Sequence, residues 1–114
     1  MGKAQLPYDS VRDALSGIPD VEEATSWGAP AWKTGGKMFA CAPTNRSAEP
    51  GSLVVRIAFD RRAELLAEAP ETYYITDHYA GYTGVLVRLA KVDQTALRDL
   101  LIGAMKFVAA KKKR

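Results

Sequence analysis

Apolar and polar residues follow one another along this chain in patterns that predict both helices and strands. Apolar residues alternate between two faces at 53–59 and again at 85–90, as they do on half-buried strands. They recur every three or four positions at 9–16, 61–69 and 94–110, as they do on amphipathic helices. We expect these segments to share one core, because 114 residues are enough to bury one without metal or disulfide links.

Capping residues mark the ends of the predicted helices. Asp60 and Asp93 precede the second and third helices, where a carboxylate accepts hydrogen bonds from the first free backbone N–H groups. Gly17 follows the last turn of the first helix, and the second helix ends before Pro70.

Two arginines, Arg61 and Arg62, lie in the first turn of the second predicted helix. Cations at that end oppose the helix dipole. We interpret them as surface residues that pair with Glu64 and Glu68.

Residues 31–42 predict a β-hairpin. Gly35 and Gly36 separate two short strands and can adopt the positive φ angles that a two-residue turn requires. In that register Trp32 faces Phe39, and the two rings share one side of the hairpin. We expect that side to lie in the core.

The order of the predicted elements is helix, three strands, helix, strand, helix, with the first strand at 24–27. Neighbouring strands joined by a hairpin and a loop are typical of an antiparallel sheet. We therefore predict an α+β two-layer sandwich, in which an antiparallel sheet of about four or more strands carries the helices on one face. Residues 1–114 form a single domain with a basic tail at 111–114.

The net charge of +3 is a property of that tail. The four residues from Lys111 to Arg114 are all basic, and removing them leaves 12 basic and 13 acidic residues, a net charge of −1. Nucleic-acid-binding proteins usually concentrate positive charge on a folded face, so the overall charge supports that function only weakly. Segment 25–48 is different, because it contains Lys33, Lys37 and Arg46 and no acid.

Composition also bears on location. The single cysteine, Cys41, excludes an internal disulfide framework and is typical of a reducing compartment. No apolar run approaches the roughly 20 residues of a membrane-spanning helix, and the first residues lack the apolar segment of a signal peptide. We expect a cytoplasmic protein with no membrane role.

Two predicted strands carry an arginine at the same place. Ser52-Leu-Val-Val-Arg-Ile-Ala58 parallels Gly84-Val-Leu-Val-Arg-Leu-Ala90. If helices cover the stronger apolar row, Arg56 and Arg88 share the uncovered face, where guanidinium groups could bind phosphate or carboxylate. The alternative is that their stems cover apolar neighbours and their charges pair with nearby acids.

Tyrosines gather between residues 73 and 82, at Tyr73, Tyr74, Tyr79 and Tyr82. Exposed tyrosines bind bases or protein partners, whereas buried ones seal the edge of a core. We expect two of the four to be buried and two to be exposed.

The residues with reactive side chains do not form a catalytic or metal-binding set. His78 adjoins Asp77, but neighbours on an extended chain point apart, and a triad also needs a positioned nucleophile. His78 and Cys41 together offer two ligands where a zinc site needs at least three. We predict no catalytic residue, no metal, no cofactor and no enzymatic activity.

Several motifs together resemble the MmcQ/YjbR family of small bacterial proteins. They are Trp27-Gly-Ala-Pro-Ala-Trp-Lys, Gly36-Lys-Met-Phe-Ala40, His78-Tyr-Ala-Gly-Tyr82 and Val85-Leu-Val-Arg-Leu89. The resemblance runs in order from about Val11 to Val108. It implies a compact fold like that of frataxin-type proteins and of the double-wing DNA-binding domain of a phage transcription factor. Members are commonly labelled as DNA-binding, a label that rests on the fold.

Two functions follow from these observations. The first is a small non-enzymatic module that contacts DNA through the uncovered sheet face and the hairpin. Its candidate site residues are Lys33, Lys37, Arg56, Arg88, Tyr79 and Tyr82. The alternative is a protein-interaction or small-ligand-binding module with no nucleic-acid role, as the net charge of −1 outside the tail suggests. We expect a monomer or a weak dimer.

Overall fold

A computed structural model describes residues 6–26 and 28–111 of the chain. Its elements follow in this order: α1 (Leu6–Leu15), β1 (Glu22–Ser26), β2 (Ala29–Thr34), β3 (Lys37–Cys41), β4 (Ser52–Arg56), α2 (Phe59–Glu68), β5 (Tyr73–Tyr74), the 3-10 helix η2 (Asp77–Tyr79), β6 (Gly84–Arg88) and α3 (Gln94–Lys111).

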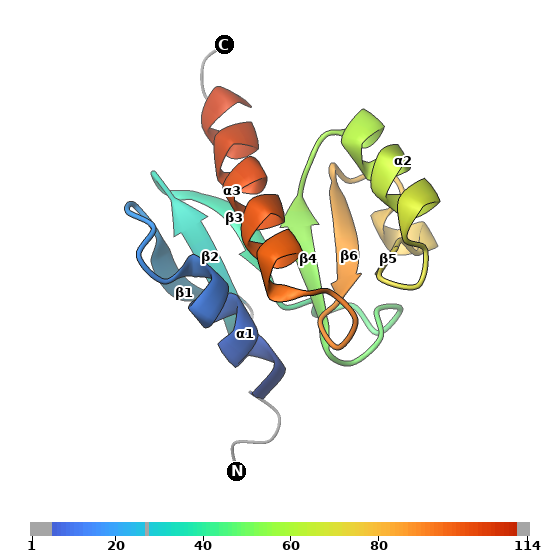
Figure 1. Ribbon diagram of the computed structural model, residues 1–114, viewed down its shortest axis with the longest axis horizontal. Helices are drawn as coiled ribbons and strands as arrows, with labels where there is room; N and C mark the ends of the chain where they lie inside the picture. The colour runs from blue at the N-terminus through green and yellow to red at the C-terminus, as the bar shows by residue number, and fades with distance from the viewer. Residues whose placement is uncertain (1–5, 27, 112–114) are drawn as a thin grey trace.

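The strands form one antiparallel sheet in the order β1-β2-β3-β4-β6-β5. The helices α1, α2 and α3 all lie on one face of this sheet (Figure 1). The predicted α+β fold is therefore confirmed, with six strands in the described residues.

The core fills the space between the helices and the sheet. Val55 of β4 and Val85 of β6 lie opposite each other and are buried beneath the helix layer. Leu97, Leu101 and Ala104 lie on one stripe of α3 and have no exposed surface. The long third helix thus supplies the central apolar face that its residue spacing predicts.

The predicted hairpin is present, but its register shifts by one residue. Gly35 and Gly36 adopt φ angles of +57° and +79°, as the tight turn requires. An irregularity between Trp32 and Lys33 then pairs Trp32 with Ala40, so the expected pairing of Trp32 with Phe39 is wrong. Both rings are nevertheless buried in the core, because an extra residue on one strand lets Phe39 turn inward.

The two predicted helix caps differ in outcome. Asp93 caps α3, since its Oδ1 accepts a hydrogen bond of 2.8 Å from the backbone N–H of Ala96. Asp60 does not cap α2. It lies inside the first turn, where it accepts from the N–H of Arg61, and the N-cap position is held by Ala58.

Several boundaries also move. α1 begins at Leu6 instead of residue 9, and the strand predicted for 53–59 ends at Arg56, so that Phe59 opens α2. The first strand covers Glu22–Ser26, and Trp27 of its predicted span lies outside the described residues. β5 and η2 are absent from the sequence prediction, because two and three residues are too few to show a periodic pattern.

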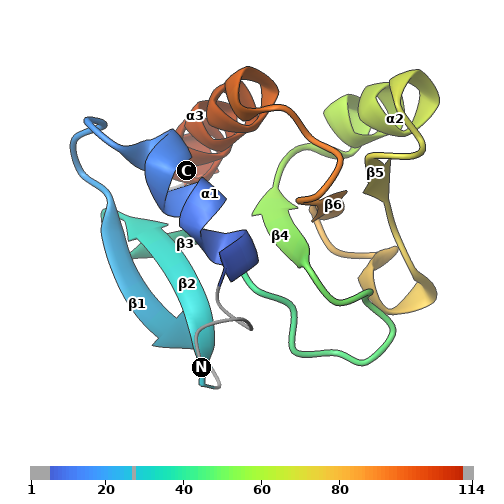
Figure 2. The ribbon, with the colours of Figure 1, turned by 60° about the horizontal axis from the view of Figure 1, so that its bottom comes forward.

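The second face of the sheet is not uncovered, and this corrects the expectation on which the predicted site rests. Val54 and Leu86 point away from the helices, yet their exposed fractions are only 3% and 0%. The loop after β3 and the segment that contains η2 lie on this side of the sheet (Figure 2). Two irregular segments therefore take the place of a second helix layer.

Among the residues that the model describes, no helix has the length and apolar character needed to cross a membrane.

Candidate ligand-binding cleft

A cleft of about 270 Å³ opens on the second face of the sheet, where the covering is incomplete. Side chains of the sheet form its floor and those of the η2 segment form one wall. Six of its lining residues are Met38, Cys41, Val54, His78, Tyr79 and Tyr82. Residues 42–44, which begin the loop after β3, complete the lining. We call this cavity the tyrosine cleft.

Arg62 of α2 holds the turn that carries the cleft tyrosines. Its guanidinium donates hydrogen bonds to the backbone carbonyls of Tyr82 and Ala80, each at 2.9 Å, of Gly84 at 3.2 Å and of Tyr79 at 3.4 Å. Backbone carbonyls outside regular structure need such partners when water is excluded. One side chain from the helix layer therefore fixes residues 79–84.

Tyr82 is positioned by close packing at the start of β6. A Cβ atom added at Gly84 would lie 2.9 Å from the Tyr82 ring and 3.1 Å from the carbonyl oxygen of Val55. Only glycine leaves room for the ring at that position. The Arg56 guanidinium carbon lies 4.8 Å from the centre of the same ring.

Arg56 itself is anchored to the same turn. Its Nε donates to the carbonyl of Thr83 at 3.0 Å, and one terminal nitrogen donates to Thr83 Oγ1 at 2.9 Å. The side chain is only partly exposed. Arg56 therefore borders the cleft as a held cation rather than as a free surface charge.

The reactive side chains of the cleft are not activated. Burial raises the pKa of the Cys41 thiol to about 11, so the thiol stays protonated at neutral pH. His78 is exposed, its Nδ1 lies 3.2 Å from the amide nitrogen of Asn45, and its ring meets the edge of Tyr79 at 4.7 Å. No carboxylate among the described residues hydrogen-bonds to it.

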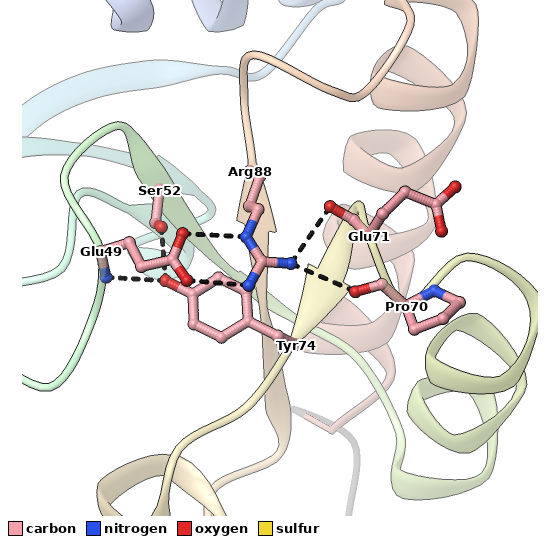
Figure 3. Close-up of polar contacts among 6 residues, drawn as sticks. All are labelled: Glu49, Ser52, Pro70, Glu71, Tyr74 and Arg88. Carbon is pink, nitrogen blue, oxygen red and sulfur yellow. Dashed lines mark hydrogen bonds and ion pairs between the residues drawn. The ribbon is translucent and has the colours of Figure 1, made fainter.

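A second polar cluster attaches the loop after β3 to the sheet (Figure 3). Arg88 forms a two-pronged pair with Glu49, at 2.9 and 2.8 Å, and also donates to the carbonyls of Pro70 and Glu71 at 3.1 Å. The guanidinium lies 4.3 Å above the ring of Tyr74. This cluster ties the loop that contains Glu49 to β5 and β6.

The Tyr74 hydroxyl completes the attachment. It lies 2.6 Å from the hydroxyl of buried Ser52 and accepts a 2.8 Å hydrogen bond from the backbone N–H of Glu49. Tyr74 therefore contacts Arg88 of β6 through its ring, and Ser52 of β4 and the loop residue Glu49 through its hydroxyl.

The structure separates the two predicted arginines. Ser52 pairs with Arg88 and Arg56 pairs with Gly84, so the arginines stand at opposite ends of the β4–β6 ladder, about 13 Å apart. They share a face, as the strand pattern predicts, but they do not form one anion site. Of the two interpretations of Arg88, pairing with a nearby acid is the one that the structure shows.

The remaining predicted site residues are two lysines on the β2–β3 hairpin and two tyrosines in the cleft. Lys37 is exposed on β3 beside the hairpin turn and Lys33 is half-buried on β2. Tyr79 and Tyr82 both line the cleft and are half-buried. The expected division of the four tyrosines is wrong: Tyr73 is buried, and the other three are half-buried because the η2 segment folds back onto the sheet.

Sequence reasoning missed Arg62 and Glu49. Arg61 does pair with Glu64, at 2.9 Å, as predicted, but Arg62 binds carbonyls instead of an acid. Its unfavourable place in the first turn of a helix was the available signal. Glu49 lies in a polar loop with no pattern that points to Arg88.

Metal ligands do not gather anywhere in the described part of the chain, since no group of three His, Cys, Asp or Glu side chains there could hold an ion. The cleft is therefore characterised by aromatic rings, apolar side chains and a bordering arginine.

These features define a small α+β domain with helices on one face of its sheet, irregular segments on the other, and an aromatic cleft between those segments. The family model YjbR matches residues 16–104, and the chain belongs to this family. The resemblance found in the sequence is thereby confirmed.

Several proteins are similar to this chain over almost its full length. Uncharacterized proteins of Mycobacterium bovis and Mycobacterium tuberculosis are 32% identical over 118 residues, covering 91% of this chain and 89% of theirs. The Deinococcus radiodurans protein DR2400, a crystal structure with a DUF419 domain, is similar with a TM-score of 0.73 and 23% identity. That match covers 93% of this chain and 80% of the other, and it shows the shared fold.

Replacing Arg62 tests how the cleft wall is held. Arg62→Ala is expected to lower the free energy of unfolding by about 2–3 kcal/mol, because it removes charged donors from carbonyls that then lack partners. Urea unfolding measures the change. The matched control Arg61→Ala removes only an exposed ion pair and is expected to change stability by less than about 1 kcal/mol. Equal effects of the two substitutions would contradict the assigned role.

The Glu49–Arg88 pair predicts a dependence of stability on pH. Hydrogen bonding to Arg88 holds the pKa of Glu49 below its usual range. The pair therefore stabilises the fold above the ordinary glutamate pKa of about 4.3, and this contribution is lost as pH falls through the lowered folded value. The difference in unfolding free energy between the natural chain and Glu49→Gln should be constant from pH 7 to about pH 5 and then shrink. A difference that stays the same down to pH 3 would show that the pair does not act in this way.

Proposed function

We propose that this YjbR-family chain is a non-enzymatic binding module whose ligand is single-stranded nucleic acid, with a base held in the tyrosine cleft. One observation carries the proposal: Tyr79, Tyr82 and His78 line a single cleft, and the Arg56 guanidinium lies 4.8 Å from the centre of the Tyr82 ring. Aromatic stacking next to positive charge is the common mode of single-strand binding.

The cleft favours a base over a duplex backbone. The centres of the Tyr79 and Tyr82 rings lie 6.4 Å apart with their planes at 63°, an edge-to-face contact that leaves no gap between the rings. A base would therefore stack against one of these rings from the cleft and would not insert between them. Arg56 and Arg88, which the sequence predicts to bind the phosphates of DNA together, do not form one phosphate site, because Arg88 is paired with Glu49.

Basic residues at the edge of the cleft near the hairpin would contact the phosphates. Met38 lines the tyrosine cleft and also a smaller hollow that Lys37 and Arg56 border. A nucleic-acid strand that leaves the cleft on that side would meet the cations Lys37 and Arg56. Lys33 lies nearby, because it pairs with Met38 on the neighbouring β-strand. Binding depends on these few charges and on the basic tail, because the rest of the chain carries a net charge of −1.

The same cleft supports a role without catalysis. A protonated Cys41 thiol is a poor nucleophile. His78 has an amide neighbour in place of the carboxylate that orients a catalytic histidine. Binding and stacking are the chemistry that these side chains can supply.

A second candidate function is a protein-interaction or small-ligand module with no nucleic-acid role. Met38, Pro43 and Val54 make one part of the cleft apolar, which suits an apolar side chain or a small aromatic ligand. This candidate predicts binding that does not weaken with salt and survives removal of the basic tail.

Fluorescence anisotropy with a labelled 20-base oligonucleotide separates the candidates. Single-stranded binding at low salt is expected to exceed that of the matched duplex. Tyr79→Leu is expected to weaken it by about 5- to 150-fold, the usual effect of losing a stacked base. Lys37→Ala is expected to reduce the salt slope by about 0.7, the value for one phosphate of a single strand.

The control Lys106→Ala removes an exposed lysine of α3 that lines neither the cleft nor its border. It should leave the affinity nearly unchanged. Absence of single-strand binding at low salt, or equal effects of Tyr79→Leu and Lys106→Ala, would rule out this mode of binding.

A further inference from the structure

A second and larger hollow lies on the other side of the sheet, between α2 and α3. It has a volume of about 530 Å³ and shares no residue with the tyrosine cleft. The two helices stand apart from each other, as Figure 1 shows. We call this hollow the interhelix groove.

The floor of the interhelix groove is part of the apolar core. Ile57, Leu65 and Leu100 line it, and each is less than a tenth exposed. Its α3 wall includes Gly103, where an added Cβ atom would have no neighbour within 4 Å. A glycine inside an exposed stretch of helix lowers stability relative to alanine. Because Gly103 has no side chain, this part of the α3 wall does not protrude into the groove.

Tyr73 also lines the floor, and its exposed fraction is 7%. None of the fully buried side-chain nitrogen and oxygen atoms in the described residues lacks a hydrogen-bond partner, so the Tyr73 hydroxyl is not an unsatisfied buried group. Its ring adds to the apolar floor of the groove.

The walls of the groove carry negative charge. Glu68 of α2 and Asp99 of α3 line it from opposite sides, and neither forms an ion pair among the described residues. The one lining cation, Arg61, is paired with Glu64. An occupant with an apolar body and positive charge on both flanks fits this arrangement.

We propose that the interhelix groove binds a basic amphipathic helix of a partner protein. Apolar residues at positions i, i+3, i+4 and i+7 of that helix would lie on the floor, as in helix-in-groove complexes. Its Lys or Arg residues would pair with Glu68 and Asp99. α2 is ten residues long, about 15 Å, so the groove accommodates roughly three turns of helix.

The proposal is tested by NMR titration of the ¹⁵N-labelled full chain with two synthetic 18-residue helical peptides. Both carry the same leucine stripe, one flanked by Lys and Arg and the other by Glu. The basic peptide is expected to shift the amide signals of Ala69, Ala96 and Gly103 and to bind about tenfold more tightly, equivalent to two exposed ion pairs. Equal affinity for the two peptides, or shifts confined to the tyrosine cleft, would overturn the proposal.

Variants of the walls make the test specific. Glu68→Lys combined with Asp99→Lys should reverse the preference between the two peptides, whereas the control Asp13→Lys on α1 should not. Gly103→Leu fills the groove from a position with open space and should abolish binding, whereas Ala109→Leu on the same helix should have no effect. Binding that survives Gly103→Leu would overturn the proposal.

Sedimentation of the protein alone tests the competing occupant. If the chain dimerises and Gly103→Leu makes it monomeric, a second copy fills the groove and the partner-helix proposal is overturned. The oligonucleotide affinity of Gly103→Leu, which leaves the charge unchanged, should equal that of the natural chain, because the proposal does not depend on the tyrosine cleft.

Discussion

The Arg62 guanidinium binds four backbone carbonyls between Tyr79 and Gly84, and the arrangement of the whole second face depends on this contact. Residues 79–84 leave η2 and turn sharply into β6 without forming a strand or helix of their own. A turn of this kind leaves carbonyls that need donors. A single charged side chain with several donors in a fixed plane satisfies them more rigidly than separate neutral groups would.

The consequence is a sheet whose two faces are covered in different ways. Helices cover one face and bury a large apolar core, although α2 and α3 stand apart and leave the interhelix groove. The other face is covered by the loop after β3 and by the η2 segment, which the Arg88–Glu49 pair and the Arg62 contacts hold down. Because these two segments do not meet over Met38 and Val54, the tyrosine cleft remains between them.

Sequence patterns predicted what periodicity controls, and they missed what long-range polar contacts control. The helices, the main strands and the Gly35-Gly36 turn follow from spacing and from backbone freedom. The cover of the second face could not be predicted, since Glu49 and Arg88 are 39 positions apart, Arg62 and Tyr82 are 20 positions apart, and no spacing pattern links either pair. The structure brings Tyr79, Tyr82 and Arg56 together, but at a cleft and not on the open sheet face that the sequence predicts.

Solvent paramagnetic relaxation of methyl groups measures most directly whether the second face of the sheet is covered. A soluble gadolinium chelate broadens the NMR signals of methyl groups that lie near solvent. With the second face covered, the methyl groups of Val54 and Leu86 should be protected nearly as well as those of Val55 and Val85 in the helix-side core. Strong broadening of Val54 and Leu86 alone would contradict this prediction, because it would mean that this face of the sheet is open to solvent.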